Sequence, residues 1–183
     1  MKLLFLISLV ALLGLLAQRL FFSFAAQDPQ TYATTEPVFD VRRVLNGPIV
    51  SEGVIFGPSG VMASRFVARM EGQWQGDSGT LSEDFTYADG TSQQRLWTLK
   101  MEKDGNFTAT APDIVGLAQG RQRGATVQLS YRIKLPDDAG GHVLDVTDWL
   151  YLMPNGAIMN KSEMRKFGVK VAELIATMRP AVQ

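Results

Sequence analysis

Alternation of apolar and polar side chains dominates the middle of the chain and predicts long β-strands. Four residues share one face of the first such strand: Leu81, Glu83, Phe85 and Tyr87. After an Asp89-Gly90 turn the same period of two continues on a second strand, whose inner face carries Arg95, Trp97, Leu99 and Met101. A period of two is typical of a strand with one buried face. The two strands therefore form a predicted hairpin whose inner faces mix aromatic side chains with a carboxylate and a guanidinium.

Strong turn signals divide residues 38–160 into about nine strand-like segments. Asp-Gly, Asn-Gly and related dipeptides, which tolerate the left-handed backbone of tight hairpins, recur roughly every dozen residues. This spacing favours antiparallel strands over alternating strands and helices. Two later strands show the pattern clearly, over residues 127–135 and 142–153.

The last segment, from Phe167 to Met178, has apolar residues at helical spacing and predicts an α-helix that ends at Arg179-Pro180. A meander of eight or more strands must also protect its edges, and closure into a barrel removes them. The expected fold is mainly β: an antiparallel meander that closes into a lipocalin-like β-barrel, with one C-terminal α-helix packed outside it or across one end. An open, strongly bent sheet wrapped around that helix is the alternative.

The N-terminus predicts export. Met1-Lys2 precedes a continuous apolar run, and Ser23-Phe24-Ala25 supplies the small residues of a cleavage site before Ala26. The alternative is an uncleaved inner-membrane anchor over residues 3–24, with Arg19 near an interface. Residues 1–25 are thus a signal peptide or anchor, residues 26–37 a polar tether and residues 38–183 one domain. The expected location is the periplasm or cell envelope.

Composition excludes several classes of function. The chain has 18 basic and 18 acidic residues, and without Lys2 and Arg19 the balance is 16 to 18, without a clustered basic surface. Nucleic acid is therefore not an expected partner. The absence of cysteine and the single histidine, His142, exclude thiol nucleophiles and zinc sites built from several imidazoles. No metal or other cofactor is expected.

A series of short motifs carries a family resemblance. In order, they are Phe39-Asp40, Asn46-Gly47-Pro48, Gly72-x-Trp74-x-Gly76, Gly79-x-Leu81-x-Glu83-x-Phe85-x-Tyr87, Arg95-x-Trp97, Asp148-Trp149-x-Tyr151-Leu152 and Asn160-Lys161-Ser162-x-Met164-x-Lys166-Phe167-Gly168. Over nearly everything after the leader the chain resembles the bacterial family of unknown function DUF3833. The resemblance implies an envelope protein of unassigned activity, often a lipoprotein, with a lipocalin-like barrel. It supplies no catalytic residues, and without cysteine no diacylglyceryl anchor can form here.

Glu83 and Arg95 are the most informative polar pair. A two-residue turn at Asp89-Gly90 would place them one position out of direct register, within reach of each other. If both point inward each needs the other, because an unpaired buried charge is costly. Two interpretations remain open: an internal salt bridge that sets the strand register, or a polar anchor for the head group of a ligand.

The expected ligand is a small apolar, amphipathic or lipid-like molecule inside the barrel. The candidate interior residues are Glu83, Arg95, Trp97, Tyr87, Trp74, Asp148, Trp149 and Tyr151. Aromatic residues also fill small barrels without any ligand. The alternative functions are therefore a structural or interaction protein of the envelope with a filled barrel, and a hydrolase or isomerase that uses the carboxylates of Glu83 and Asp148. The sequence names no protein partner, and a membrane partner follows only from an uncleaved N-terminal segment.

Overall fold

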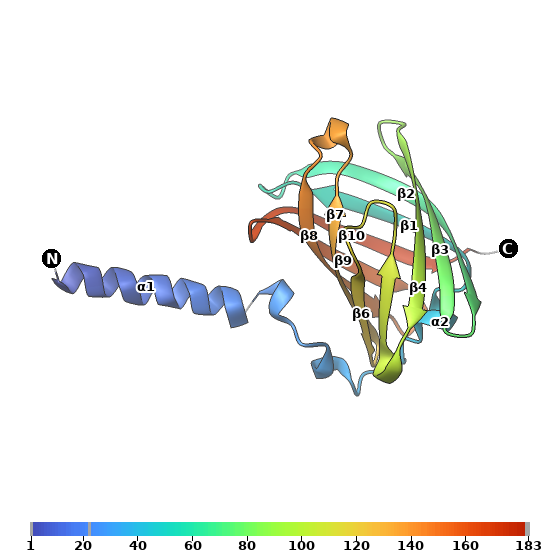
Figure 1. The fold of residues 1–183 in the computed structure, drawn as a ribbon, viewed down its shortest axis with the longest axis horizontal. Helices are drawn as coiled ribbons and strands as arrows, with labels where there is room; N and C mark the ends of the chain where they lie inside the picture. Colours follow the sequence, from blue (N-terminus) through green and yellow to red (C-terminus); the bar gives the residue numbers. More distant parts are fainter. Residues whose placement is uncertain (1, 22, 182–183) are drawn as a thin grey trace.

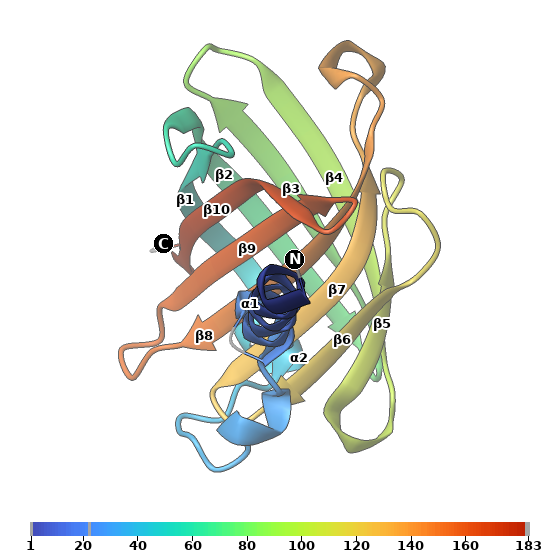
Figure 2. The same cartoon turned by 90° about the vertical axis from the view of Figure 1, so that its left-hand side faces the viewer.

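A computed structural model describes residues 2–21 and 23–181 of the chain. In this part the protein is mainly β: ten antiparallel strands follow one another around a closed barrel, and the last strand pairs with the first (Figures 1 and 2). The strands are β1 (Gly47–Phe56), β2 (Met62–Gln75), β3 (Ser78–Tyr87), β4 (Ser92–Met101), β5 (Asn106–Thr110), β6 (Ala118–Arg123), β7 (Thr126–Lys134), β8 (Val143–Leu152), β9 (Ile158–Lys166) and β10 (Val169–Pro180). The helices are α1 (Lys2–Phe21) and α2 (Val41–Val44), with short 3-10 turns η1 (Phe24–Ala26), η2 (Pro29–Tyr32), η3 (Lys103–Gly105) and η4 (Asp137–Ala139).

The predicted C-terminal helix is wrong, because this segment is strand β10. It pairs with β9 on one side and with β1 on the other, from Ile49↔Pro180 to Phe56↔Glu173. A tight turn at Phe167-Gly168, with φ values of 51° and 75°, joins β9 to β10. Eight of the twelve residues from Phe167 to Met178 are apolar, so the spacing fits either a helix or a strand. Pairing decides the outcome, because without β10 the edges of β1 and β9 would be left open.

The β3–β4 hairpin forms as predicted, but its register differs by one residue. Glu83 lies directly opposite Arg95 rather than one position away. The reason is the loop, which has three residues, 88–90, and is closed by a hydrogen bond from Tyr87 N to Thr91 O of 2.9 Å. Three-residue loops with a glycine in the last position are a common hairpin connection. The direct register places the two charged side chains on the same inner face.

One end of the barrel is closed by residues 39–45, which include α2 and which we call the plug. Phe39 and Val41 are completely buried, and Leu45 is nearly so. The indole Nε1 of Trp74 donates to the backbone oxygen of Leu45 at 2.8 Å, which ties this plug to β2. Gly72 lets the plug approach, since a Cβ there would lie 2.0 Å from the same oxygen. Leu45 is therefore the floor of the barrel.

Residues 26–37, predicted to be a polar tether, lie against the outer wall of the barrel instead. Pro29 is buried, and the Tyr32 ring packs edge-on against Trp149 of β8 with 5.3 Å between centroids. Ala125 N donates to the Thr35 hydroxyl at 2.9 Å. The segment is short and rich in polar residues, so its composition alone does not reveal the contacts made by its few apolar side chains.

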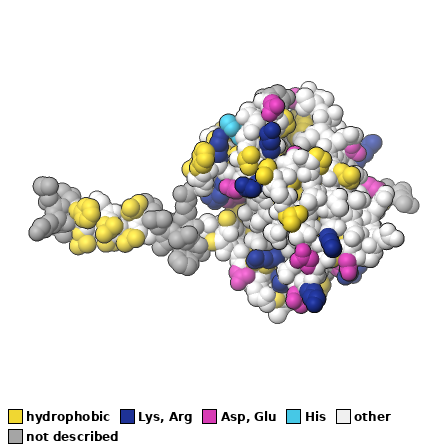
Figure 3. All heavy atoms as spheres, in the orientation of Figure 1, with side chains coloured by type: hydrophobic (Ala, Val, Ile, Leu, Met, Phe, Trp, Pro, Cys, Tyr) yellow, Lys and Arg dark blue, Asp and Glu magenta, His cyan; other side chains and the backbone are white. Residues whose placement is uncertain are grey.

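Helix α1 extends away from the barrel and carries only uncharged side chains at positions 5–14 (Figures 1 and 3). Within the described residues, no helix combines the length and the apolarity needed to span a membrane. Met1 and Phe22, which belong to the predicted leader, lie outside the described residues, as do the side chains of Lys2 and Arg19.

Candidate functional site

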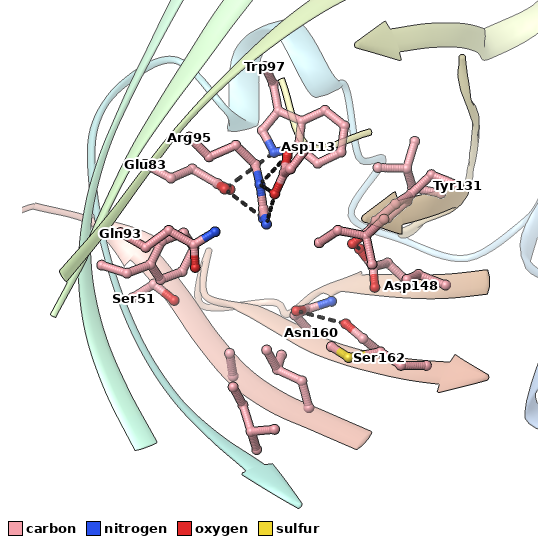
Figure 4. A pocket seen from close by; sticks show the side chains of 18 of the residues that line it. Ser51, Glu83, Gln93, Arg95, Trp97, Asp113, Tyr131, Asp148, Asn160 and Ser162 are labelled. Carbon is pink, nitrogen blue, oxygen red and sulfur yellow. Dashed lines mark hydrogen bonds and ion pairs between the residues drawn. The ribbon is translucent and has the colours of Figure 1, made fainter. Parts of the chain in front are cut away.

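The barrel encloses a cavity of about 620 Å³. It runs from Leu45 at the floor to Pro136 and Ala139, which are exposed in the β7–β8 connection at the opposite end. The wall is formed by every second residue of the surrounding strands, because alternate side chains point inward. Most of these side chains are aliphatic or aromatic. Among these side chains are polar ones that face the cavity from several strands (Figure 4).

A buried ion cluster lies on one wall, and we call its four members, Glu83, Arg95, Trp97 and Asp113, the Arg95 cluster. The guanidinium of Arg95 binds Asp113 through two nitrogens: Nε lies 3.1 and 3.0 Å from the two carboxylate oxygens, and Nη2 lies 2.7 Å from Oδ2. Its Nη1 lies 3.4 Å from Oε2 of Glu83. The same Glu83 oxygen accepts from the indole Nε1 of Trp97 at 3.3 Å.

The chain brings these residues together in two ways. Glu83 and Arg95 meet because β3 and β4 are paired in direct register. Asp113 comes from the β5–β6 connection, which is held against β7 by hydrogen bonds from Lys134 N to Asp113 O (2.8 Å) and from Val115 N to Arg132 O (2.9 Å). The connection thus fills the wall between β4 and β7 and turns a loop carboxylate toward Arg95.

Burial sets the electrostatics of the cluster. It raises the pKa of the Glu83 carboxyl to about 7, and the charge of Arg95 and the indole of Trp97 only partly oppose this. Burial lowers the pKa of Arg95, but hydrogen bonds from its guanidinium to Asp113 and the charge of Glu83 raise it above the ordinary value. The side chains of Glu83 and Arg95 are 10% and 14% exposed. Arg95 is therefore a permanent buried cation with two carboxylates around it.

A second polar group lies across the cavity, on β7, β8 and β9 (Figure 4). The Tyr131 hydroxyl donates to Oδ2 of Asp148 at 3.0 Å. Burial raises the pKa of Asp148 to about 6, against the opposing effect of the nearby Ser162 and Tyr131 hydroxyls and of Arg95. Among the described residues, Oδ1 of Asp148 has no hydrogen-bond partner. One oxygen of this carboxylate is therefore buried in the cavity wall without a hydrogen-bond partner.

Comparison with known sequences assigns the chain to a family. The model of the family described as "Protein of unknown function (DUF3833)" matches residues 18–180. The chain belongs to the DUF3833 family. None of the curated proteins compared with it matches in sequence.

Several solved structures can be aligned with the DUF3833 protein. The crystal structure of Rv2717c from M. tuberculosis is 15% identical, covers 81% of this chain and 99% of its own, and aligns with a TM-score of 0.55. The redesigned β-barrel mFAP1 bound to DFHBI is 11% identical over 76% and 97% of the two chains, with a TM-score of 0.40. A protein of Bacteroides fragilis with a YmcC-like fold is 12% identical over 72% and 94%, with a TM-score of 0.37. At these identities the first comparison speaks for the β-barrel fold alone.

Five of the eight predicted interior residues line the cavity of this DUF3833 protein: Glu83, Arg95, Trp97, Tyr87 and Asp148. Three do not. Trp74 packs into the floor against Gly79 and Leu45. Trp149 and Tyr151 point outward on β8, where Tyr32 covers them, because they alternate with the inward-facing Asp148 and Leu150.

Asp113, Tyr131 and Asn160 line the cavity but were not predicted as site residues from the sequence. Tyr131 shares one face of its strand with apolar residues such as Leu129 and Ile133, and nothing in the sequence singled it out from them. Asn160 lines the cavity and donates to the backbone oxygen of Trp149 at 3.2 Å. Asp113 follows a proline in a loop, where an aspartate is ordinarily a turn residue. The one available signal was Arg95, because a buried guanidinium needs more hydrogen-bond acceptors than Glu83 alone supplies, which suggests an additional carboxylate.

The raised pKa values of Glu83 and Asp148 predict a stability that falls as the pH rises. Glu83 has an ordinary pKa of 4.5 when unfolded and about 7 when folded, so the folded state holds the extra proton between these values. At about 1.4 kcal/mol per pKa unit, the free energy of unfolding falls by on the order of 3 kcal/mol from pH 4.5 to 7. Asp148 adds a similar fall between pH 3.8 and about 6.

We expect Glu83→Gln with Asp148→Asn to remove this part of the pH dependence. Urea unfolding at a series of pH values, monitored by tryptophan fluorescence, measures it. Asp84→Asn, on the exposed outer face of β3, is the control and should keep the wild-type slope. An unchanged slope in the double variant would show that the two carboxyls titrate normally.

Proposed function

We propose that this DUF3833 protein binds a small amphipathic molecule inside its barrel, as a carrier or receptor. The observation that carries the proposal is a cavity of about 620 Å³ whose wall is mostly apolar and includes a set of polar side chains, here called the polar belt: Glu83, Arg95, Asp113, Tyr131 and Asp148. Ligand sites have volumes of about 300 to 1,000 Å³, with mostly apolar walls and a few placed polar groups. As in lipocalin-like proteins, the apolar wall contacts the apolar body of the ligand, and the polar belt orients its head group.

The polar belt is better explained by a ligand than by stability alone. A buried ion pair seldom stabilises a fold more than apolar residues of the same size would. Here one guanidinium is accompanied by the carboxyls of Glu83, Asp113 and Asp148, all lining the same cavity. A filled barrel, the structural alternative, would not need this excess of acceptors.

Location in the cell envelope is also part of the proposal. It rests on the apolar run over residues 3–17 and on the small residues at positions 23 and 25. Release into the periplasm after cleavage before Ala26 and attachment to the inner membrane by residues 3–24 remain the two forms it can take. The intact mass of the purified protein distinguishes them.

Native mass spectrometry of protein purified from its own envelope without detergent tests the proposal. We expect an adduct of a few hundred daltons that leaves on unfolding. Leu129→Trp, which places a larger ring in the cavity from β7, should lower the fraction of protein that carries the adduct, since Leu129 lines it. Ser130→Trp, on the exposed outer face of the same strand, is the matched control and should retain it.

The outcome is read together with the thermal midpoint of each variant. A lower adduct fraction in Leu129→Trp counts only if that variant melts within a few degrees of Ser130→Trp. A clean apo mass for the wild type, repeated after incubation with lipid extract, would contradict ligand binding and favour the filled barrel of an interaction protein.

A second candidate function is acid-base catalysis by Glu83 and Asp148. The specific observation in its favour is that both pKa values lie near neutrality, as a proton-transferring pair requires. Burial alone also produces such values. Recovery of the bound molecule chemically unchanged after prolonged incubation would count against catalysis, whereas turnover that disappears in Glu83→Gln would support it.

A further inference from the structure

The contacts that Arg95 already makes limit which ligand head groups the cavity can bind. Its guanidinium already makes the two-nitrogen contact with Asp113 and the contact with Glu83. The rings of Phe85 and Trp97 lie at 6.0 and 5.7 Å from its central carbon. An incoming carboxylate or phosphate would compete with both carboxylates for the guanidinium, and displacement of Asp113 would leave that carboxylate buried without its partner, which is costly.

No other cation compensates within the cavity. Of the residues that line the described cavity, Arg95 and Lys134 are the only cations, and Lys134 is exposed at the open end. Three carboxyl groups, those of Glu83, Asp113 and Asp148, face the same space. An anionic head group would therefore enter a region in which carboxyl groups already outnumber cations.

The free acceptor lies opposite the Arg95 cluster. Oδ1 of Asp148 is buried and has no partner among the described residues, while Oδ2 is held by Tyr131. Ser162 faces Asp148 from β9 and lowers the pKa of its carboxyl, while its hydroxyl lies 3.5 Å from Oδ1 of Asn160. Buried polar atoms without partners are rare in folded proteins and mark places where a ligand or water supplies the missing hydrogen bond.

We propose that the ligand is an amphiphile with a protonated amine as its head group, held by Asp148 from one wall and Glu83 from the other. This rests on the proposed function, because it names the chemistry of a ligand in the same cavity. An ammonium group supplies three donors and a positive charge, which matches a site with unsatisfied acceptors and excess carboxylate. Charge-assisted hydrogen bonds to a carboxylate are about twice as strong as those between neutral groups.

Displacement of a neutral dye separates this inference from the function on which it rests. Nile red reports occupancy of the apolar cavity, and its binding should be weakened in Leu129→Trp but kept in Ser130→Trp. Dodecylamine, dodecanol and dodecanoate, used at pH 8 below their micellar concentrations, then compete with the dye. Failure of Nile red to bind the wild type would contradict the proposed function itself.

We expect dodecylamine to displace the dye at concentrations at least about tenfold lower than dodecanol or dodecanoate, since tenfold corresponds to one good charge-assisted contact. Asp148→Asn should remove most of this preference and leave dodecanol unchanged. Asp145→Asn, on the exposed outer face of β8, is the matched control and should keep it.

Acidification provides an independent readout. Asp148 faces Tyr131, Ser162, Glu83 and Arg95, and its protonation near pH 6 should weaken dodecylamine relative to dodecanol. Two results would overturn the amine assignment while leaving the proposed function standing. In the first, Nile red binds but dodecanoate or dodecanol displaces it at the same or a lower concentration than dodecylamine. In the second, Nile red binds but dodecylamine does not displace it.

Discussion

Replacement of Arg95 by methionine is expected to lower the free energy of unfolding at pH 8 by about 3 to 5 kcal/mol, the range found when one partner of a buried ion pair is removed. Arg95 is the only cation in contact with Glu83 and Asp113 in the described structure. Without it, both carboxyls remain facing a low-dielectric wall. Because folded domains are stable by only about 5 to 15 kcal/mol, such a loss removes a large part of the total.

The penalty should depend on pH with a definite sign. Removal of Arg95 raises the pKa of Glu83 further, since the charge of Arg95 is the largest influence that lowers it. The variant should therefore recover stability as the pH falls from 8 to 5, where its carboxyls can be protonated. Urea unfolding at both pH values measures the difference.

Two further variants keep the test decisive if Arg95→Met fails to fold. Arg95→Lys keeps the charge but loses the two-nitrogen contact with Asp113, so we expect a smaller loss. Combination of Arg95→Met with Glu83→Gln and Asp113→Asn removes all three charges and should restore much of the stability. A loss below about 1 kcal/mol in Arg95→Met at pH 8 would show that the cluster is effectively solvated.

The interior of the barrel was predictable where a strict period of two and strong turns act together. On β3 and β4 these signals assigned Glu83, Arg95 and Trp97 to the cavity side, and the structure confirms that assignment. On β8 the period was equally clear, but both faces carry apolar and acidic residues. The pattern therefore could not tell that Asp148 faces the cavity while Trp149 faces outward.

The remaining errors come from contacts between distant parts of the chain. Strand β10 is stabilised by pairing with β1, more than a hundred residues earlier, and its own spacing does not reveal that partner. Asp113 becomes a ligand of Arg95 only because its loop is held against β7. The segment around Tyr32 was judged by its polar composition, whereas a single ring decides where it packs.

Replacement of Trp149 by alanine should destabilise the protein about as strongly as loss of Arg95, but without affecting the cavity. Trp149 is completely buried on the outer face of β8, where its ring stacks on Tyr151 at 6.0 Å and meets Tyr32 edge-on. Removal of a buried tryptophan side chain costs about 3 to 5 kcal/mol. We expect urea unfolding to show this loss. Under conditions in which the variant is fully folded, its affinity for Nile red should stay within about twofold of wild type, because a lower free energy of unfolding does not change binding to the folded state.

Three variants make this expectation specific. Trp149→Phe should cost much less, because the indole Nε1 has no hydrogen-bond partner among the described residues and a ring is retained. Tyr32→Ala combined with Trp149→Ala should lose less than the sum of the two single losses, by about 0.5 to 1.5 kcal/mol for an aromatic pair. Trp97→Ala, on the cavity side, should weaken Nile red binding. Additive losses for Tyr32 and Trp149 would mean that the N-terminal segment does not pack on β8 in solution, whereas coupled losses make this segment part of the folded barrel wall.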